Sequence, residues 1–237
     1  MLLPLFVDFP KSKSARITRA IFDQTLAIDA QQQGPAYFEK VTGLCRHIQE
    51  WCVKESRSFL RMRIETNLAD LLFKQEKYND ALEILRNLNY ELKKKDDKQL
   101  LVESQLVESK VYHALLNTNK AKAALTAVKT TANSIYIVPL LQAEIDFMSG
   151  LIAADENDYI LAYSYFYETF EGFRAMNNVP LAGKAFKFML FSKIMNKQSD
   201  DALNLINSAL SLKYQSKKLD AMKEVAVANK QQSLHQF

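Results

Sequence analysis

The sequence predicts an all-α protein, organised as a right-handed solenoid of stacked helix pairs. Three observations lead to this prediction. Glycine and proline are scarce, with 5 of each in 237 residues, so the chain has few places to turn and its elements are long. Apolar residues recur at helical spacing along almost the whole chain. A short motif also returns about every forty residues, which is typical of helical repeats.

The first half of the chain reads as helices separated by short polar breaks. Ser12 or Ser14 can cap a helix that runs to about residue 32, and Gly34-Pro35 ends it. A second helix follows over about 35–55. A third begins near Ser58 and carries apolar residues at helical spacing, namely Leu60, Ile64, Leu68 and Leu71.

The fourth helix begins near Asn79 and ends in three lysines, Lys93 to Lys95, which suit the negative end of the helix dipole. Later helices are expected over about 98–116, 119–133, 139–154, 158–175, 180–195, 199–213 and 217–230. The run from Ser134 to Pro139 (SIYIVP) is the one β-like stretch, and it is too short and isolated to form a sheet. We expect it to be a connector, and we expect about ten to eleven helices in all.

Helix pairs are marked by a small residue placed soon after a tight polar turn. The runs KYNDAL, KAKAAL, DYILAY and SDDAL place Ala81, Ala124, Ala162 and Ala202 at this position. A methyl group there lets two antiparallel helices approach closely near their shared turn. The interval between these alanines drifts around a mean of about forty, which predicts a degenerate solenoid similar to tetratricopeptide or HEAT repeats.

Enzymatic and metal-binding patterns are missing from the sequence. The five glycines form no phosphate-binding loop, and the three histidines, His47, His113 and His235, are isolated. We expect His113 to be a packed or partly exposed residue near a helix end. Glu103, Glu108 and Lys110 are interpreted as a solvated helix face. We therefore predict no enzyme activity, and no catalytic, cofactor-binding or metal-binding residue.

The two cysteines, Cys45 and Cys52, lie seven residues apart, which places both on one face of a helix, whereas His47 points away from them. A structural zinc site needs four ligands, and none is supplied nearby. Buried free thiols are the expected outcome. The apolar start MLLPLFVDFP lacks the pattern of a signal peptide, and no run approaches the roughly 18 apolar residues of a membrane span. This predicts a soluble intracellular protein.

The net charge of +4 can be placed at one basic cluster, formed by Lys11, Lys13, Arg16 and Arg19. A solvated face on the first helix explains such a cluster best, but it also prompts one alternative function, an RNA-binding helical repeat.

The run AYSYFYETFEGF, residues 162–173, holds six aromatic side chains. Helical geometry puts Ala162, Tyr163, Phe166, Phe170 and Phe173 on one face, opposite Ser164, Glu168 and Glu171. This predicts the buried face of a helix and not a platform for bases, because acidic residues on the exposed face would repel phosphate. Tyr165 is the aromatic residue that we expect to remain available to a partner.

Three runs closely resemble the PCI family, whose members build the lid of the 26S proteasome, the COP9 signalosome and a translation initiation complex. They are 94–115 (KKDDKQLLVESQLVESKVYHAL), 119–136 (NKAKAALTAVKTTANSIY) and 162–173. The resemblance implies a non-catalytic scaffold of the proteasome lid in ubiquitin-dependent degradation. Its implied partners are other lid subunits, the ATPase ring and the outer ring of the core particle, and its implied location is the cytoplasm and the nucleus. A solenoid adaptor of the COP9 signalosome is the related alternative.

The family continues into a winged-helix PCI module, whereas this sequence stops at Phe237. We therefore expect residues 1–237 to form a single TPR-like solenoid without that module. Neither a small-molecule substrate nor a membrane contact is expected, and nucleic-acid binding is disfavoured.

Overall fold

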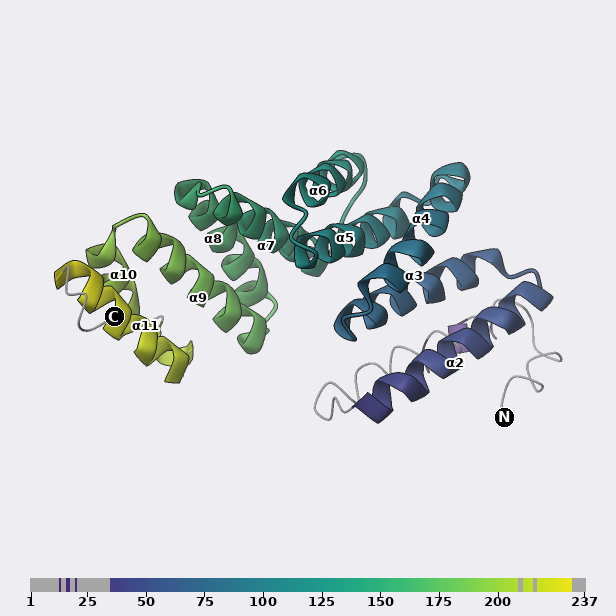
Figure 1. Ribbon diagram of the computed structural model, residues 1–237, viewed down its shortest axis with the longest axis horizontal. Helices are drawn as coiled ribbons and strands as arrows, with labels where there is room; N and C mark the ends of the chain where they lie inside the picture. Colours follow the sequence, from purple (N-terminus) through teal and green to yellow (C-terminus); the bar gives the residue numbers. More distant parts are fainter. Residues whose placement is uncertain are drawn as a thin grey trace. The chain divides into compact units, whose positions relative to one another are not determined.

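The computed structural model describes residues 13, 16, 17, 20, 35–208, 211–214 and 217–231. Most of the helix expected over 12–32 lies outside these residues. The described part of the chain contains ten α-helices and a short 3₁₀ helix, and it contains no strand (Figure 1). The all-α prediction of stacked helix pairs is therefore confirmed.

The helices follow one another with short turns. They are α2 (Pro35–Lys54), α3 (Ser58–Lys74), α4 (Tyr78–Lys95), α5 (Lys98–Ala114), α6 (Thr118–Ala132), α7 (Pro139–Asp155), α8 (Tyr159–Ala175), α9 (Val179–Met195), α10 (Ser199–Ile206) and α11 (Lys217–Gln231). The predicted boundaries of α2 to α9 agree with these to within about two residues.

The helix expected over 199–213 is interrupted. It ends at Ile206, and a 3₁₀ helix, η3, follows over Ser211–Tyr214. Two serine hydroxyls explain the break, because Ser208 Oγ donates to the carbonyl of Leu205 (2.6 Å) and Ser211 Oγ donates to the carbonyl of Ile206. Such side-chain bonds compete with the helical ladder.

The chain divides into two compact units, residues 1–111 and 112–237. In the first, α3 packs against α2 and α4. In the second, successive helices from α6 to α11 pack pairwise, and α9 also touches α11. The organisation of residues 1–237 as one solenoid stays a prediction.

Tight turns of a single type join most of these helices. Each contains a residue with positive φ, and these are Ser56, Glu76, Asp96, Leu116, Asn157, Asn177 and Lys197. The next residue donates its N–H to a carbonyl five positions back, as Asn117 does to Tyr112 (2.9 Å). This is the Schellman arrangement, which satisfies the last carbonyls of a helix. The positive-φ residues recur at a constant interval along the chain, except across the connection between α6 and α7.

The small residue predicted after each turn is present, but one of the four was misplaced. Ala81, Ala162 and Ala202 are fully buried, whereas Ala124 is half-buried and Ala121 is fully buried in its place. Ala121 occupies the fourth position of α6, as Ala81 does in α4 and Ala162 in α8. With Ala121 in the series the intervals become almost equal, so the repeat is more regular than the sequence motif indicated.

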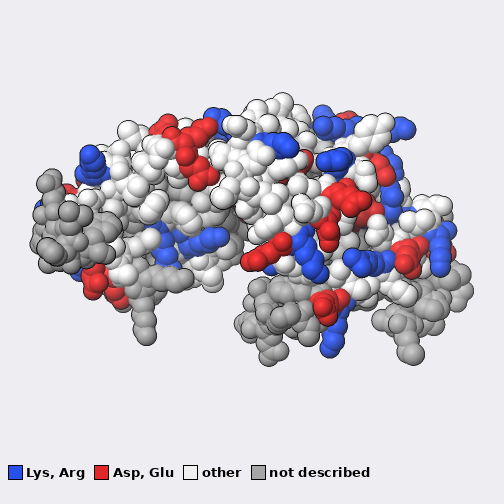
Figure 2. Space-filling model, in the orientation of Figure 1, with Lys and Arg blue, Asp and Glu red and all other residues white. Residues whose placement is uncertain are grey.

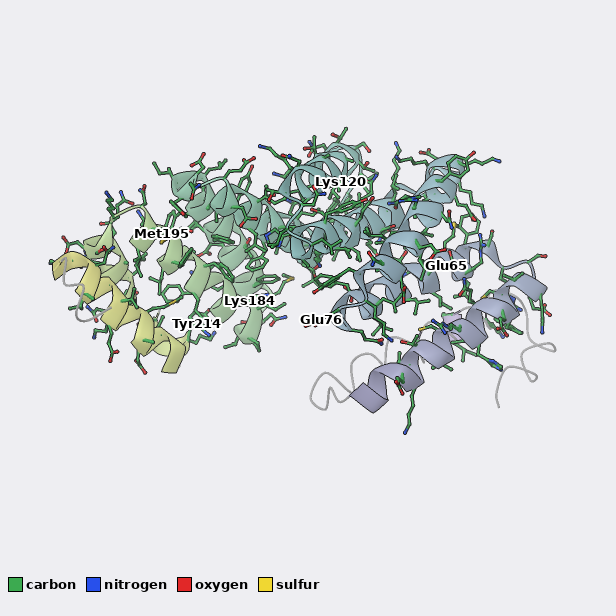
Figure 3. All side chains as sticks on the ribbon, in the orientation of Figure 1. Glu65, Glu76, Lys120, Lys184, Met195 and Tyr214 are labelled. Carbon is green, nitrogen blue, oxygen red and sulfur yellow. The ribbon has the colours of Figure 1, made fainter. Side chains whose placement is uncertain are left out.

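The core of the second unit is aromatic. Phe166 and Phe170 of α8 meet Phe188 and Phe186 of α9, with ring centroids 5.1 and 5.7 Å apart. Tyr214 of η3 closes this core beside α9, 6.0 Å from the ring of Phe186 (Figure 3). The core of the first unit is aliphatic, and Cys45 and Cys52 belong to it.

Candidate protein-interaction sites

A polar groove of about 660 Å³ lies across α2, α3 and α4 in the first unit. Its lining residues are Gln49, Arg61, Glu65, Ile84, Arg86, Asn87, Tyr90 and Glu91. Tyr90 is 73% exposed, and Arg86 and Asn87 are also exposed. An exposed aromatic ring flanked by polar side chains is typical of a protein contact surface.

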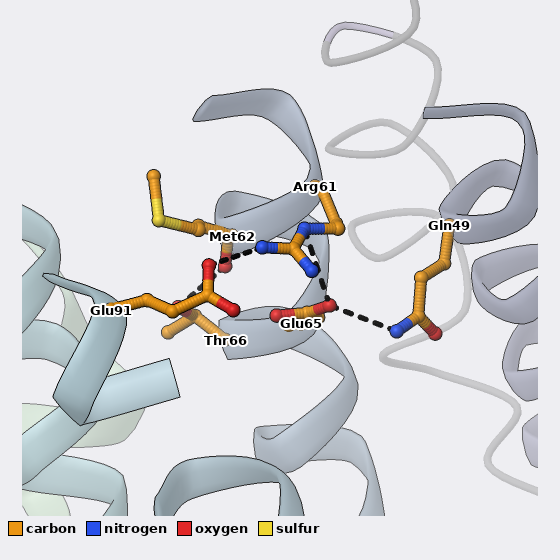
Figure 4. Close-up of polar contacts among 6 residues, drawn as sticks. All are labelled: Gln49, Arg61, Met62, Glu65, Thr66 and Glu91. Atoms are coloured by element: carbon orange, nitrogen blue, oxygen red, sulfur yellow. Dashed lines mark hydrogen bonds and ion pairs between the residues drawn. The ribbon is translucent and has the colours of Figure 1, made fainter. Parts of the chain in front are cut away.

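Four of the lining side chains form a relay of polar contacts (Figure 4). Gln49 of α2 donates to Glu65 Oε1 of α3 over 2.9 Å. Arg61 pairs with Glu65 at 3.8 Å and with Glu91 of α4 at closer range. Three consecutive helices are thus tied together by one amide, one guanidinium and two carboxylates.

Burial dominates the electrostatics of this relay. Desolvation raises the pKa of the Glu65 carboxyl, and Arg61 and Gln49 oppose that rise only in part. A buried acid of this kind can serve as a general acid elsewhere. Here its oxygens face an arginine and an amide, and none of the described residues that line the groove is Ser, Cys, His or Lys. The arrangement holds three helices in position.

The structure confirms most of the buried face that was predicted for the aromatic run on α8. Ala162, Phe166, Phe170 and Phe173 are buried, and Tyr163 is half-buried. The helix is therefore a core element and not an exposed stacking platform.

The choice of Tyr165 as the available aromatic residue was wrong. Lys129 Nζ of α6 lies 4.4 Å from the centre of the Tyr165 ring and donates to its hydroxyl over 3.2 Å. Tyr167 is instead 43% exposed. The physical reason is that α8 has neighbours on more than one side, whereas the helical wheel assumed a single buried face.

The same effect overturns the interpretation of Glu103, Glu108 and Lys110 as a solvated face. All three are half-buried. Glu103 pairs with Arg63 of α3 at 2.9 Å, and Glu108 accepts from Asn89 of α4 at 2.8 Å. These acids join helices instead of facing water, and burial raises the pKa of Glu108.

The cysteine and histidine predictions agree with the structure where it describes them. Cys45 and Cys52 are buried and free, and His47 of the same helix is exposed. Burial raises the pKa of Cys45 to about 12 and that of Cys52 to about 11. His113, close to the end of α5, pairs with Asp155 at 2.9 Å, and His235 lies outside the described residues.

Neither a metal site nor a membrane span emerges from the described residues. No three His, Cys, Asp or Glu side chains gather there as metal ligands would. None of the described helices combines the length and the apolar character that crossing a bilayer requires.

Surface charge is mixed. Lysines and arginines alternate with acidic side chains on the face shown in Figure 2. Of the predicted basic cluster, Lys13 and Arg16 are exposed on helical backbone, and Lys11 and Arg19 lie outside the described residues.

Comparison with known proteins supports the resemblance found in the sequence. Residues 2–75 match the family described as the 26S proteasome regulatory subunit RPN6 N-terminal domain. A 26S proteasome non-ATPase regulatory subunit 11 homolog of Arabidopsis thaliana is 44% identical over 236 residues, which are 100% of this chain and 55% of that protein. Regulatory subunit RPN6 of Saccharomyces cerevisiae is 38% identical over 98% of this chain and 53% of its own length.

A probable regulatory subunit rpn6 of Schizosaccharomyces pombe is 39% identical over 99% of this chain and 54% of its own. The chain spans about half the length of these curated relatives. The similarity extends from one end of the chain to the other, across both compact units. The chain is therefore related, over its whole length, to part of the Rpn6-type non-ATPase regulatory subunits of the 26S proteasome.

Proposed function

We propose that this chain is the helical-repeat part of a non-catalytic scaffold subunit in the lid of the 26S proteasome regulatory particle. In this role it helps to hold the lid and the ATPase ring to the core particle during ubiquitin-dependent degradation. The observation that carries the proposal is the identity of 38–44% to regulatory subunits of that particle over essentially the whole chain.

The geometry is consistent with a scaffold. Stacked helices present side chains on successive outer faces, and each repeat is stabilised mainly by its neighbours. In the polar groove of α2 to α4, the ion pairs of Arg61 with Glu65 and Glu91 hold helices together, which is in keeping with a scaffold. Enzymatic activity is therefore assigned to other subunits, and cytoplasm and nucleus are the locations that proteasome membership implies.

The proposal is tested by affinity purification of the full-length protein. A tag on this protein is used for capture, and quantitative mass spectrometry measures the proteins recovered with it. We expect this protein at the same stoichiometry as the other lid subunits. Recovery only with a signalosome, or only with RNA, would refute the lid assignment and favour one of the two alternatives.

A functional measurement complements the purification. Depletion of the full-length protein is expected to lower the fraction of core particles that carry a regulatory particle, as measured by native gel electrophoresis. The peptidase activity of isolated core particles should not change, because the protein is proposed to join particles and not to act on substrates. An unchanged fraction of capped core particles after depletion would contradict a joining role.

A further inference from the structure

The connection between α6 and α7 departs from every other turn described above. A positive-φ residue occurs at Leu116 and next at Asn157, so the otherwise regular series skips the turn that would fall near Tyr136. Pro139 explains the exception. It is the first residue of α7, and the residue before a proline is held in an extended conformation. Val138 accordingly has φ −64° and ψ 135°.

The backbone of this connector, residues 134–138, is largely unpaired. The N–H groups of Tyr136, Ile137 and Val138 make no hydrogen bond within the described part of the chain. The same holds for the carbonyls of residues 135–137. Groups of this kind on an extended segment can pair with another strand.

The side chains of the connector alternate as those of a strand do. Ile135 and Ile137 are half-buried. Tyr136 is 88% exposed and Val138 is 49% exposed. A period of two with one face outward is the pattern of a strand that offers its side chains to a partner.

The chemistry of this stretch selects the class of partner. No charged residue occurs between Lys129 and Glu144, so the connector offers no cation to the phosphates of nucleic acid or lipid. An uncharged run of β-branched and aromatic residues with free backbone groups matches the edge of a β-sheet. An exposed tyrosine is also among the residues that most often anchor protein interfaces.

We propose that residues 136–138 of the connector are a docking strand, which pairs through its backbone with an edge β-strand of a neighbouring subunit and places Tyr136 in an apolar pocket of that subunit. This inference rests on the proposed function, because the neighbour is taken to be a subunit of the same regulatory particle. To the proposed function it adds the segment of this chain that makes the contact and the type of structural element that the partner contributes.

Hydrogen exchange tests the backbone pairing. The full-length protein is measured free and within the purified regulatory particle. In the free protein, the amides of residues 136–138 are expected to exchange at the rate of an unstructured chain. In the particle, we expect their exchange to slow by roughly a hundredfold or more, as for amides in paired strands. Fast exchange in the particle would overturn the docking strand even if Tyr136 were covered.

Substitution tests the anchor. Tyr136→Ala in the full-length protein is expected to lower its incorporation into the particle roughly tenfold or more. Leu116→Ala is the matched control, because Leu116 is 89% exposed and lies in an ordinary turn of the same unit. Circular dichroism should be unchanged for both. Equal incorporation of the two variants would overturn the anchor role, and a wild-type protein absent from the particle would refute the proposed function and this inference with it.

Discussion

Gly150→Ala should destabilise the second unit, although alanine is normally the better helix residue. Gly150 lies within α7, and a Cβ added to it would stand 2.6, 2.8 and 2.9 Å from three ring carbons of Phe166. Carbon atoms pack without repulsion at about 3.5–4.0 Å, so the ring must move by about 1 Å. The ring cannot move freely, because Phe147 and Phe188 lie on it with centroids 5.6 and 5.1 Å away.

The expected net effect follows from two opposing contributions. Overpacking a filled core costs about 1–3 kcal/mol, and replacing a helical glycine by alanine contributes up to about 1 kcal/mol in favour of folding. We therefore expect a loss of about 1–2 kcal/mol in the free energy of unfolding. Gly183→Ala is the matched control in α9, since its nearest neighbour would be Tyr214 Cδ1 at 3.5 Å, an ordinary contact. That variant should gain about 0.5–1 kcal/mol.

Urea unfolding followed by far-UV circular dichroism measures both variants. A third protein, carrying Gly150→Ala together with Phe166→Leu, tests the mechanism. The smaller side chain makes room for the new methyl group, so Gly150→Ala should cost little in the Phe166→Leu background. Equal effects of Gly150→Ala in both backgrounds, or stabilisation by Gly150→Ala in the wild type, would refute the packing described for α7 and α8.

Three further predictions concern other parts of the chain. Leu116→Gly should raise stability by about 0.5–1 kcal/mol in urea unfolding, because Leu116 has φ 57° and its side chain is 89% exposed; a loss would show that this turn carries no strain. Phe166→Ala should lower the free energy of unfolding by about 3–5 kcal/mol because it leaves a cavity, and Tyr165→Ala should lower it by about 0.5–1 kcal/mol because it removes the contact with a lysine. Similar small losses for both variants would show that the buried face of α8 is assigned incorrectly. Glu65→Gln should remove a pH dependence of stability. The folded-state pKa of Glu65 is raised from 4.5, so the native state holds this proton more tightly than the unfolded chain, and wild-type stability falls as pH rises from below 4.5 through the raised value. A stability difference between wild type and Glu65→Gln that stays constant with pH would contradict this account.

Periodicity predicted the helices well because their apolar stripes are long and their breaks are short. The same reasoning misplaced the alanine of α6. The run KAKAAL contains three alanines, and Ala124 was selected because a bulky residue, Leu125, follows it. Counting from the turn would have selected Ala121, since the contact depends on the distance from the shared turn. Position relative to the helix start was therefore the better signal.

The candidate groove could not be predicted from the sequence, because its relay joins residues far apart in the chain. Gln49 and Glu65 are separated by 16 positions, and Arg61 and Glu91 by 30. A helical wheel assigns each helix one buried side. In a stack, a helix such as α5 or α8 has neighbours on several sides, so polar residues on its flanks meet other helices. The errors at Tyr165 and Glu108 have this single cause.

The regular turns indicate what sets the repeat. The seven positive-φ residues in the described part of the chain are Ser, Glu, Asp, Leu, Asn, Asn and Lys, and none is glycine. Asp and Asn adopt the left-handed conformation more readily than other residues, but it costs Ser, Glu, Leu and Lys about 1–2 kcal/mol each, so local preference alone does not place all of these turns. The length of the helices is the more regular feature. Helices α3, α5, α7, α8 and α9 all have 17 residues, and the turn after each of them has the same length. Packing between helices of equal length therefore accounts for the turns that follow these five helices. The connector before Pro139 lies where this constraint is relaxed, and there the chain offers a free backbone to a partner.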